Sequence, residues 1–90
     1  MEFKTLDDKI VYINEEGTAL AEIDFPSVDE STVNISHTVV DDSLRGQGIA
    51  GKLTELAAEH LKKEGKKIIP TCSYAKMWFD QHPEYSDLLK

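Results

Sequence analysis

The sequence predicts an α/β fold in which a mixed sheet of about four strands is covered by two main helices. Three observations support this class. Up to residue 40 apolar residues tend to alternate with polar ones, which is typical of strands, whereas from residue 49 they recur with helical spacing. A glycine-rich turn separates the two patterns. Ninety residues suffice for one domain with a small core, so we expect a single unit spanning residues 1–90.

The N-terminal half is expected to form an antiparallel meander. Residues 1–8 are mostly polar and should fray or form an edge contact. Strands are expected at residues 9–14, 18–25 and 32–40, where β-branched and aromatic side chains are common. Alternation assigns one face of the second strand, expected to be buried, to Ala19, Ala21, Ile23 and Phe25, and one face of the third to Val33, Ile35, His37 and Val39.

The C-terminal half is expected to contribute two helices and a fourth strand. A helix should begin at Ile49 and be capped by Gly65, with a buried stripe of Ile49, Leu53, Leu56, Ala57, His60 and Leu61. Residues 66–70 are typical of a strand that joins a parallel neighbour through a right-handed crossover. Ser73 is expected to cap a second helix that runs through Gln81 and ends before Pro83. The apolar side chains expected to anchor this end of the chain include Tyr74, Met77, Trp78, Phe79, Tyr85, Leu88 and Leu89.

A formal net charge of −7 argues against nucleic acid and anionic membranes as partners, because clustered Lys and Arg side chains bind both. No apolar run reaches the length of a membrane span or a secretory signal, so we expect a cytoplasmic protein. The single cysteine, Cys72, cannot form an internal disulfide, which fits a reducing compartment. One cysteine and three scattered histidines lack the spacing of a metal site, so no metal is predicted.

The glycine-rich turn has the composition of a phosphate-binding loop. Gly46, Gly48 and Gly51 permit positive φ and a close approach of the backbone, and the helix that follows offers unpaired N–H groups. A Walker loop is set aside because Leu53 occupies the position of the magnesium-binding hydroxyl. A dinucleotide loop is set aside because the preceding strand is not the first, and because residues 66–69 lack the expected acidic residue.

The segment Arg45-x-x-Gly48-x-Ala50 resembles the coenzyme A pyrophosphate loop of the GNAT superfamily of N-acetyltransferases. Three further segments, His37-Thr38-x-Val40, Pro70-x-Cys72-Ser73-Tyr74 and His82-Pro83-x-Tyr85, make the chain similar to very small acetyltransferase-like proteins of that superfamily. The resemblance implies acetyl-coenzyme A as the cofactor. It further implies that the backbone of Thr38, Val39 and Val40 pairs with the pantetheine arm, and that Arg45, Gly46, Gln47, Gly48, Ile49 and Ala50 hold the pyrophosphate.

Cys72 and His37 are the candidate catalytic residues. Cys72 lies between the fourth strand and the last helix, where it could carry the acetyl group, line the pocket or simply fill the core. His37 could act as a general base, although alternation also allows a structural role on an apolar face. The family usually places a tyrosine on the last helix, where it is the acid that protonates the departing thiolate. Phe79 occupies the matching position, with Tyr74 and Tyr85 as nearby substitutes.

Two functions therefore compete. The first is an acetyl-coenzyme A-dependent N-acetyltransferase acting on an amine, either a small molecule or a protein. The second is a module that binds coenzyme A or acetyl-coenzyme A without turnover, favoured by Phe79 and by the lack of the elements with which larger relatives build the acceptor wall. A homodimer would supply that wall. A third hypothesis, a ligand-free interaction domain, leaves the glycine-rich loop unexplained.

Overall fold

The computed structural model describes residues 2–90. Met1, included in the prediction of a fraying terminus, lies outside the described residues. The elements follow one another along the chain as β1 (Glu2–Thr5), β2 (Lys9–Ile13), β3 (Ala19–Asp24), β4 (Thr32–Ile35), β5 (His37–Val40), the 3-10 helix η1 (Asp42–Leu44), α1 (Ile49–Lys63), β6 (Lys67–Pro70), α2 (Ser73–Gln81) and the 3-10 helix η2 (Pro83–Leu88).

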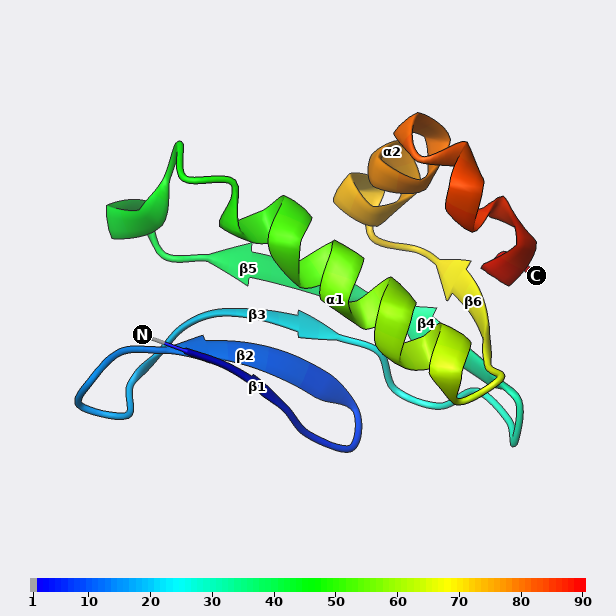
Figure 1. Ribbon diagram of the computed structural model, residues 1–90, viewed down its shortest axis with the longest axis horizontal. Coiled ribbons are helices and arrows are strands. Elements are labelled where there is room, and N and C mark those ends of the chain that lie inside the picture. Colours follow the sequence, from blue (N-terminus) through cyan, green and yellow to red (C-terminus); the bar gives the residue numbers. More distant parts are fainter. Residues whose placement is uncertain (1) are drawn as a thin grey trace.

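The predicted α/β class is confirmed, but the strands form two sheets rather than one. Strands β1, β2, β3 and β5 form an antiparallel sheet in that order, and β4 pairs in parallel with β6. Helix α1 lies across one face of the four-stranded sheet, and α2 follows β6 beside it (Figure 1). We call the opposite face of that sheet the outer face. Residues 2–5, expected to fray or to make an edge contact, form the edge strand β1.

The prediction of one continuous strand over residues 32–40 is wrong, because the chain breaks at Ser36. Val33 and Ile35 are buried, as their alternation predicts, but His37 is exposed and Val39 is 43% exposed. The break shifts the alternation by one residue, so Thr38 and Val40 lie on the α1 side of the sheet while His37 and Val39 lie on the outer face.

A smaller register shift explains a second error in the predicted burial. Ala21, Ile23 and Phe25 are buried as expected, but Ala19 is exposed. The pairing of β2 with β3 is irregular between Tyr12 and Ile13, so Ala19 lies outside the regular alternation of β3.

Helix α1 agrees closely with its prediction. Leu53, Ala57 and Leu61 are buried against the sheet, together with Thr54, whose hydroxyl donates a hydrogen bond to the Ala50 carbonyl. At the other end Gly65 takes a φ of 70°. The amides of Gly65 and Lys66 donate to the carbonyls of Lys62 and Leu61, which closes the helix in a Schellman motif.

The predicted start of α2 needs one correction. Cys72, not Ser73, occupies the N-cap position, and no side chain caps the helix there. The helix nevertheless runs to Gln81 and buries Trp78 and Phe79, whereas Met77 is 45% exposed. The C-terminal turn then packs on the core through Leu88, Leu89 and Tyr85.

We expect Leu53→Ala to lower the free energy of unfolding by about 3 kcal/mol, because it leaves a cavity at a fully buried position between α1 and the sheet. Leu56→Ala, the same substitution one turn away at a half-buried position, should cost about half as much. Urea denaturation of both variants measures the difference. Equal losses of unfolding free energy would contradict the conclusion that Leu53 is more deeply buried under α1 than Leu56.

Candidate active site

The site begins where the two sheets separate at Ser36. The carbonyl of Ile35 accepts hydrogen bonds from the amides of Thr71 and Cys72, both at 3.1 Å, which ends the pairing of β4 with β6. The amide of Ser36 instead donates to the Asp24 carbonyl at 3.2 Å, and β5 continues with β3 as its one strand partner. Within residues 2–90 the second edge of β5, on the side of the β6–α2 connection, therefore has no strand partner. An extended ligand can pair with such an edge.

A thiol lies beside β5. Cys72 is half-buried at the start of α2, and its Sγ lies 3.8 Å from the Thr38 hydroxyl oxygen of β5. Burial by itself would raise the pKa of the Cys72 thiol. The Ala75 and Tyr74 amides at the helix N-terminus and the Thr38 hydroxyl outweigh burial, so the pKa is lowered. The thiolate is thus more populated near neutral pH than in an ordinary cysteine.

The glycine-rich loop forms a hollow beside Val40, the last residue of β5. Gly46 and Gly48 take φ values of 82° and 73°, and Gly48 is the N-cap of α1, with no side chain over the first amides of the helix. The hollow measures about 220 Å³ and is lined by Val40, Leu44, Arg45, Gly46, Gly48, Ile49, Ala50, Gly51 and Tyr74. Its lining includes most of the predicted pyrophosphate-binding residues but not Gln47, which is exposed.

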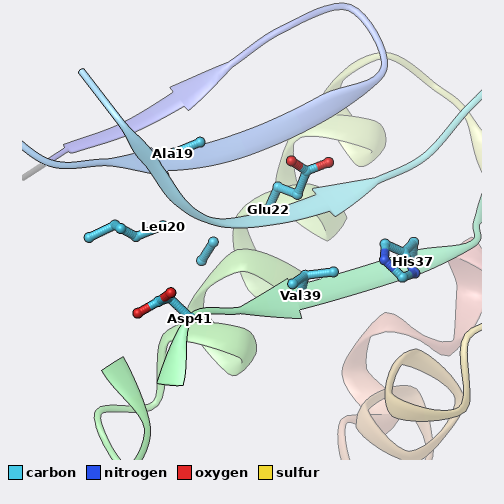
Figure 2. A pocket seen from close by; sticks show the side chains of 7 residues that line it. Ala19, Leu20, Glu22, His37, Val39 and Asp41 are labelled. Carbon is cyan, nitrogen blue, oxygen red and sulfur yellow. The ribbon is translucent and has the colours of Figure 1, made fainter. Parts of the chain in front are cut away.

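His37 does not lie with Cys72, although its neighbour Thr38 does. Adjacent residues of a strand point to opposite faces, so the imidazole lies on the outer face. Figure 2 shows it beside Glu22 and Val39, along a depression of about 330 Å³ that extends to Asp41. The imidazole is exposed, and the depression that it lines carries the apolar Val39 beside the charged Glu22 and Asp41.

Sequence reasoning overlooked the carboxylates beside His37. Asp24 lies opposite His37 in the β3–β5 pairing, and Lys9 forms ion pairs with both Glu22 and Asp24, at 3.3 and 3.8 Å. Burial and the neighbouring Glu22 carboxylate raise the pKa of Asp24, whereas a hydrogen bond with Asp24 lowers the pKa of Glu22. Alternation in β3 places both carboxylates on the face opposite Ala21 and Ile23. The sequence does not show that β3 pairs with the strand that carries His37.

The tyrosines near the site differ in what their hydroxyls contact. Phe79 is buried in the core and offers no hydroxyl. The Tyr85 hydroxyl donates to Glu59 on α1 at 2.6 Å, and this bond raises the pKa of Tyr85 to about 12. Tyr74 instead lines the hollow of the glycine-rich loop, and burial raises its pKa, so it stays protonated near neutral pH.

These features agree with a family comparison. A family model for GCN5-related N-acetyl-transferases matches residues 9–88. The chain belongs to this family. Protein NATD1 from Xenopus tropicalis is 36% identical over 56 residues, which cover 62% of this chain and 51% of NATD1. The chain thus matches about half the length of this relative.

Two solved structures of family members have the same fold. A GCN5-like protein from Staphylococcus aureus is 38% identical, with a TM-score of 0.80, and the match covers 99% of this chain and 87% of that one. The GNAT family N-acetyltransferase YhbS from Escherichia coli, solved in complex with CoA, is 24% identical, with a TM-score of 0.62. That match covers 69% of this chain and 38% of YhbS, and it shows likeness of fold alone.

Residues 2–90 contain no group of three or more His, Cys, Asp or Glu side chains that could hold a metal ion. Neither α-helix of that segment has the length and apolar composition needed to cross a bilayer.

We expect alkylation of Cys72 by iodoacetamide to reach its maximal rate at a lower pH than alkylation of an unstructured cysteine peptide, because the folded protein lowers the thiol pKa. Thr38→Val removes the hydroxyl beside the thiol and should move the midpoint toward higher pH. Thr71→Val is the matched control, since the Thr71 hydroxyl donates to Asn34 instead. An unchanged midpoint in Thr38→Val would contradict the assigned contact.

Proposed function

We propose that this chain is an acetyl-coenzyme A-dependent N-acetyltransferase that acetylates an amine. The observation that carries the proposal is the unpaired edge of β5, with the Cys72 thiol of lowered pKa beside Thr38 and the hollow of the glycine-rich loop beside Val40. The E. coli relative of known structure binds CoA, which supports the same cofactor here.

The cofactor would be held mainly by main-chain groups. The open edge of β5, at Thr38, Val39 and Val40, offers backbone groups to the pantetheine arm. The loop from Arg45 to Ala50, which includes Gly46, Gln47, Gly48 and Ile49, offers amides and the positive end of the α1 dipole to the pyrophosphate.

In the proposed reaction Cys72 is the nucleophile. Its thiolate attacks the thioester carbonyl, a carbon–sulfur bond forms to Cys72, and the bond to the coenzyme sulfur breaks, which releases the coenzyme thiolate. The neutral amine then attacks the acetyl-cysteine, and the Cys72 thiolate leaves. His37 lies on the opposite face of the sheet from Cys72, so it would accept the proton of an amine that reaches the acetyl group past the unpaired edge of β5. In a simpler mechanism the amine attacks the thioester directly and Cys72 lines the pocket.

A non-catalytic module that binds coenzyme A is the second candidate. The buried Phe79 favours it, because the residue at the position of the family's usual acid lacks a hydroxyl. The amine substrate, a cytoplasmic location and a homodimer that supplies the acceptor wall remain predictions of the sequence.

We expect Gly48→Val to weaken binding of acetyl-coenzyme A at least 100-fold, because a β-branched residue is strained at a φ of 73° and would disturb the first turn of α1. Gln47→Val at the neighbouring exposed position is the matched control and should change the Kd less than threefold. Isothermal titration calorimetry measures both. If acetyl-coenzyme A does not bind the wild-type protein, the proposed function is wrong.

We expect intact mass spectrometry to detect one acetyl group on the wild-type protein after incubation with acetyl-coenzyme A, and none on Cys72→Ala. The variant should keep the cofactor Kd within about threefold and lose at least 100-fold in transfer to an amine. A Cys72→Ala variant with wild-type turnover would eliminate the covalent step and favour direct transfer. Binding by the wild type with no turnover on any amine would favour the non-catalytic module.

A further inference from the structure

Within residues 2–90 one buried side-chain atom lacks a hydrogen-bond partner, and it belongs to the outer face. The atom is Asp24 Oδ1 on β3. The ammonium group of Lys9 lies 3.8 Å from this oxygen but 3.3 Å from Glu22 Oε2, so it donates its hydrogen bond to Glu22. A buried acceptor without a donor is costly, so Asp24 needs a donor that Lys9 does not supply.

The sheet brings two candidate donors to Asp24. Burial and a hydrogen bond with Glu22 raise the pKa of Asp24, while the same bond lowers the pKa of Glu22, so in acid a proton shared by the two carboxyl groups stays on Asp24. Once Asp24 is ionised, the donor has to come from another residue. His37 lies directly opposite Asp24 in the β3–β5 pairing. Side chains opposite each other in an antiparallel pair have Cβ atoms about 5 Å apart, which an imidazole and a carboxylate can bridge.

The charged groups around Asp24 favour a second cation. On β3 the neighbouring carboxylate is Glu22, which takes the Lys9 hydrogen bond. On β2 Lys9 is the residue opposite Asp24, and Asp8 in the preceding turn adds negative charge beside Lys9. Three carboxylates thus surround one ammonium group, so a cation supplied from β5 would be stabilised by the carboxylate that Lys9 leaves unpaired.

His37 is placed to supply that cation. Its side chain is exposed, so the ring can turn without displacing packed neighbours. Figure 2 shows the ring on β5 in the depression that Glu22 also lines, with Asp41 at the far end of the strand. Asp24 lies on the β3 side of the ring, and the unpaired edge of β5 lies on the other side. One ring nitrogen can therefore donate to Asp24 while the other accepts a proton at the unpaired edge.

We propose that Asp24 is a positioning residue for His37: its carboxylate accepts a hydrogen bond from one ring nitrogen, orients the ring and stabilises the imidazolium. In the transfer step an N–H bond of the amine breaks, its proton passes to the other ring nitrogen, and the ring later releases that proton to water. This inference rests on the proposed function, in which His37 is the base.

The first test does not depend on turnover. NMR titration of the full chain follows the ring protons of its three histidines, His37, His60 and His82. In Asp24→Asn the titration midpoint of the His37 ring should fall by at least about half a pH unit, because a nearby negative charge is lost, while the other two rings keep theirs. Asp8→Asn, the same charge change at an exposed turn residue, is the matched control and should move the His37 midpoint by less than about 0.2 pH unit.

The second test is kinetic and uses the best acceptor among primary alkylamines, diamines and lysine peptides. Asp24→Asn should lower kcat about tenfold, keep the KM for the amine within about twofold, and move the acid limb of the kcat profile to lower pH, because a weaker base loses its proton at lower pH. In a His37→Gln background the same substitution should have no further effect, since Asp24 acts through His37. Circular dichroism confirms that each variant is folded.

The outcomes separate this inference from the proposed function. A lower His37 midpoint in Asp24→Asn alone, with a loss of kcat that requires His37, would support the inference. An unchanged midpoint, equal shifts in Asp24→Asn and Asp8→Asn, or equal losses of kcat with and without His37 would overturn it and leave the proposed function standing. If the wild type acetylates none of the amines, the proposed function fails, and with it the role of Asp24 in transfer.

Discussion

The hydrogen bonds on either side of Ser36 determine how the rest of the molecule is arranged. Once the Ile35 carbonyl accepts the amides of Thr71 and Cys72, β6 can pair with β4 but not with β5. The Ser36 amide is bonded to Asp24, which keeps β5 on β3. One residue thus divides a nine-residue segment between two sheets, and the unpaired edge of β5 that results lies beside the start of α2.

The same break gives the two faces of β5 different chemistry. Because Ser36 shifts the alternation, Thr38 turns toward the Cys72 thiol while His37 turns to the outer face with its carboxylates. A continuous strand would have placed His37 on the same face as Ile35. In the proposed reaction the cofactor and the nucleophile lie on the α1 side, and the amine approaches the base from the open side. A negatively charged outer face is suited to attract a cationic amine before it loses its proton.

The elements that depend on local sequence could be predicted, and so could the parallel pairing of residues 67–70, but the division of the strands between two sheets could not. The span of α1, its cap at Gly65 and the glycine-rich loop follow from side-chain period and from the φ requirements of glycine. Alternation over residues 32–40 is regular only as far as Ile35, because three polar residues follow at 36–38 and two valines at 39–40. This local irregularity does not show that β5 pairs with β3 while β4 pairs with β6, which is what divides the segment. The N-cap at Cys72 has the same origin, since its amide bonds to Ile35 before the helix begins.

An acidic chain that binds a polyanion needs its cations near the phosphates and little repulsion around them. Arg45 of the glycine-rich loop and Lys52 of the first turn of α1 each pair with a carboxylate three residues away. Arg45 Nε lies 3.0 Å from Asp42, and Lys52 pairs with Glu55. These pairs are exposed, so little free energy is lost when a phosphate replaces the carboxylate. The amides at the start of α1 attract phosphate through the helix dipole and carry no formal charge. The net charge of −7 opposes phosphate binding only through its long-range field, which salt screens within about 10 Å. Local donors can therefore outweigh the unfavourable net charge, and the acidic surface remains available to attract an amine.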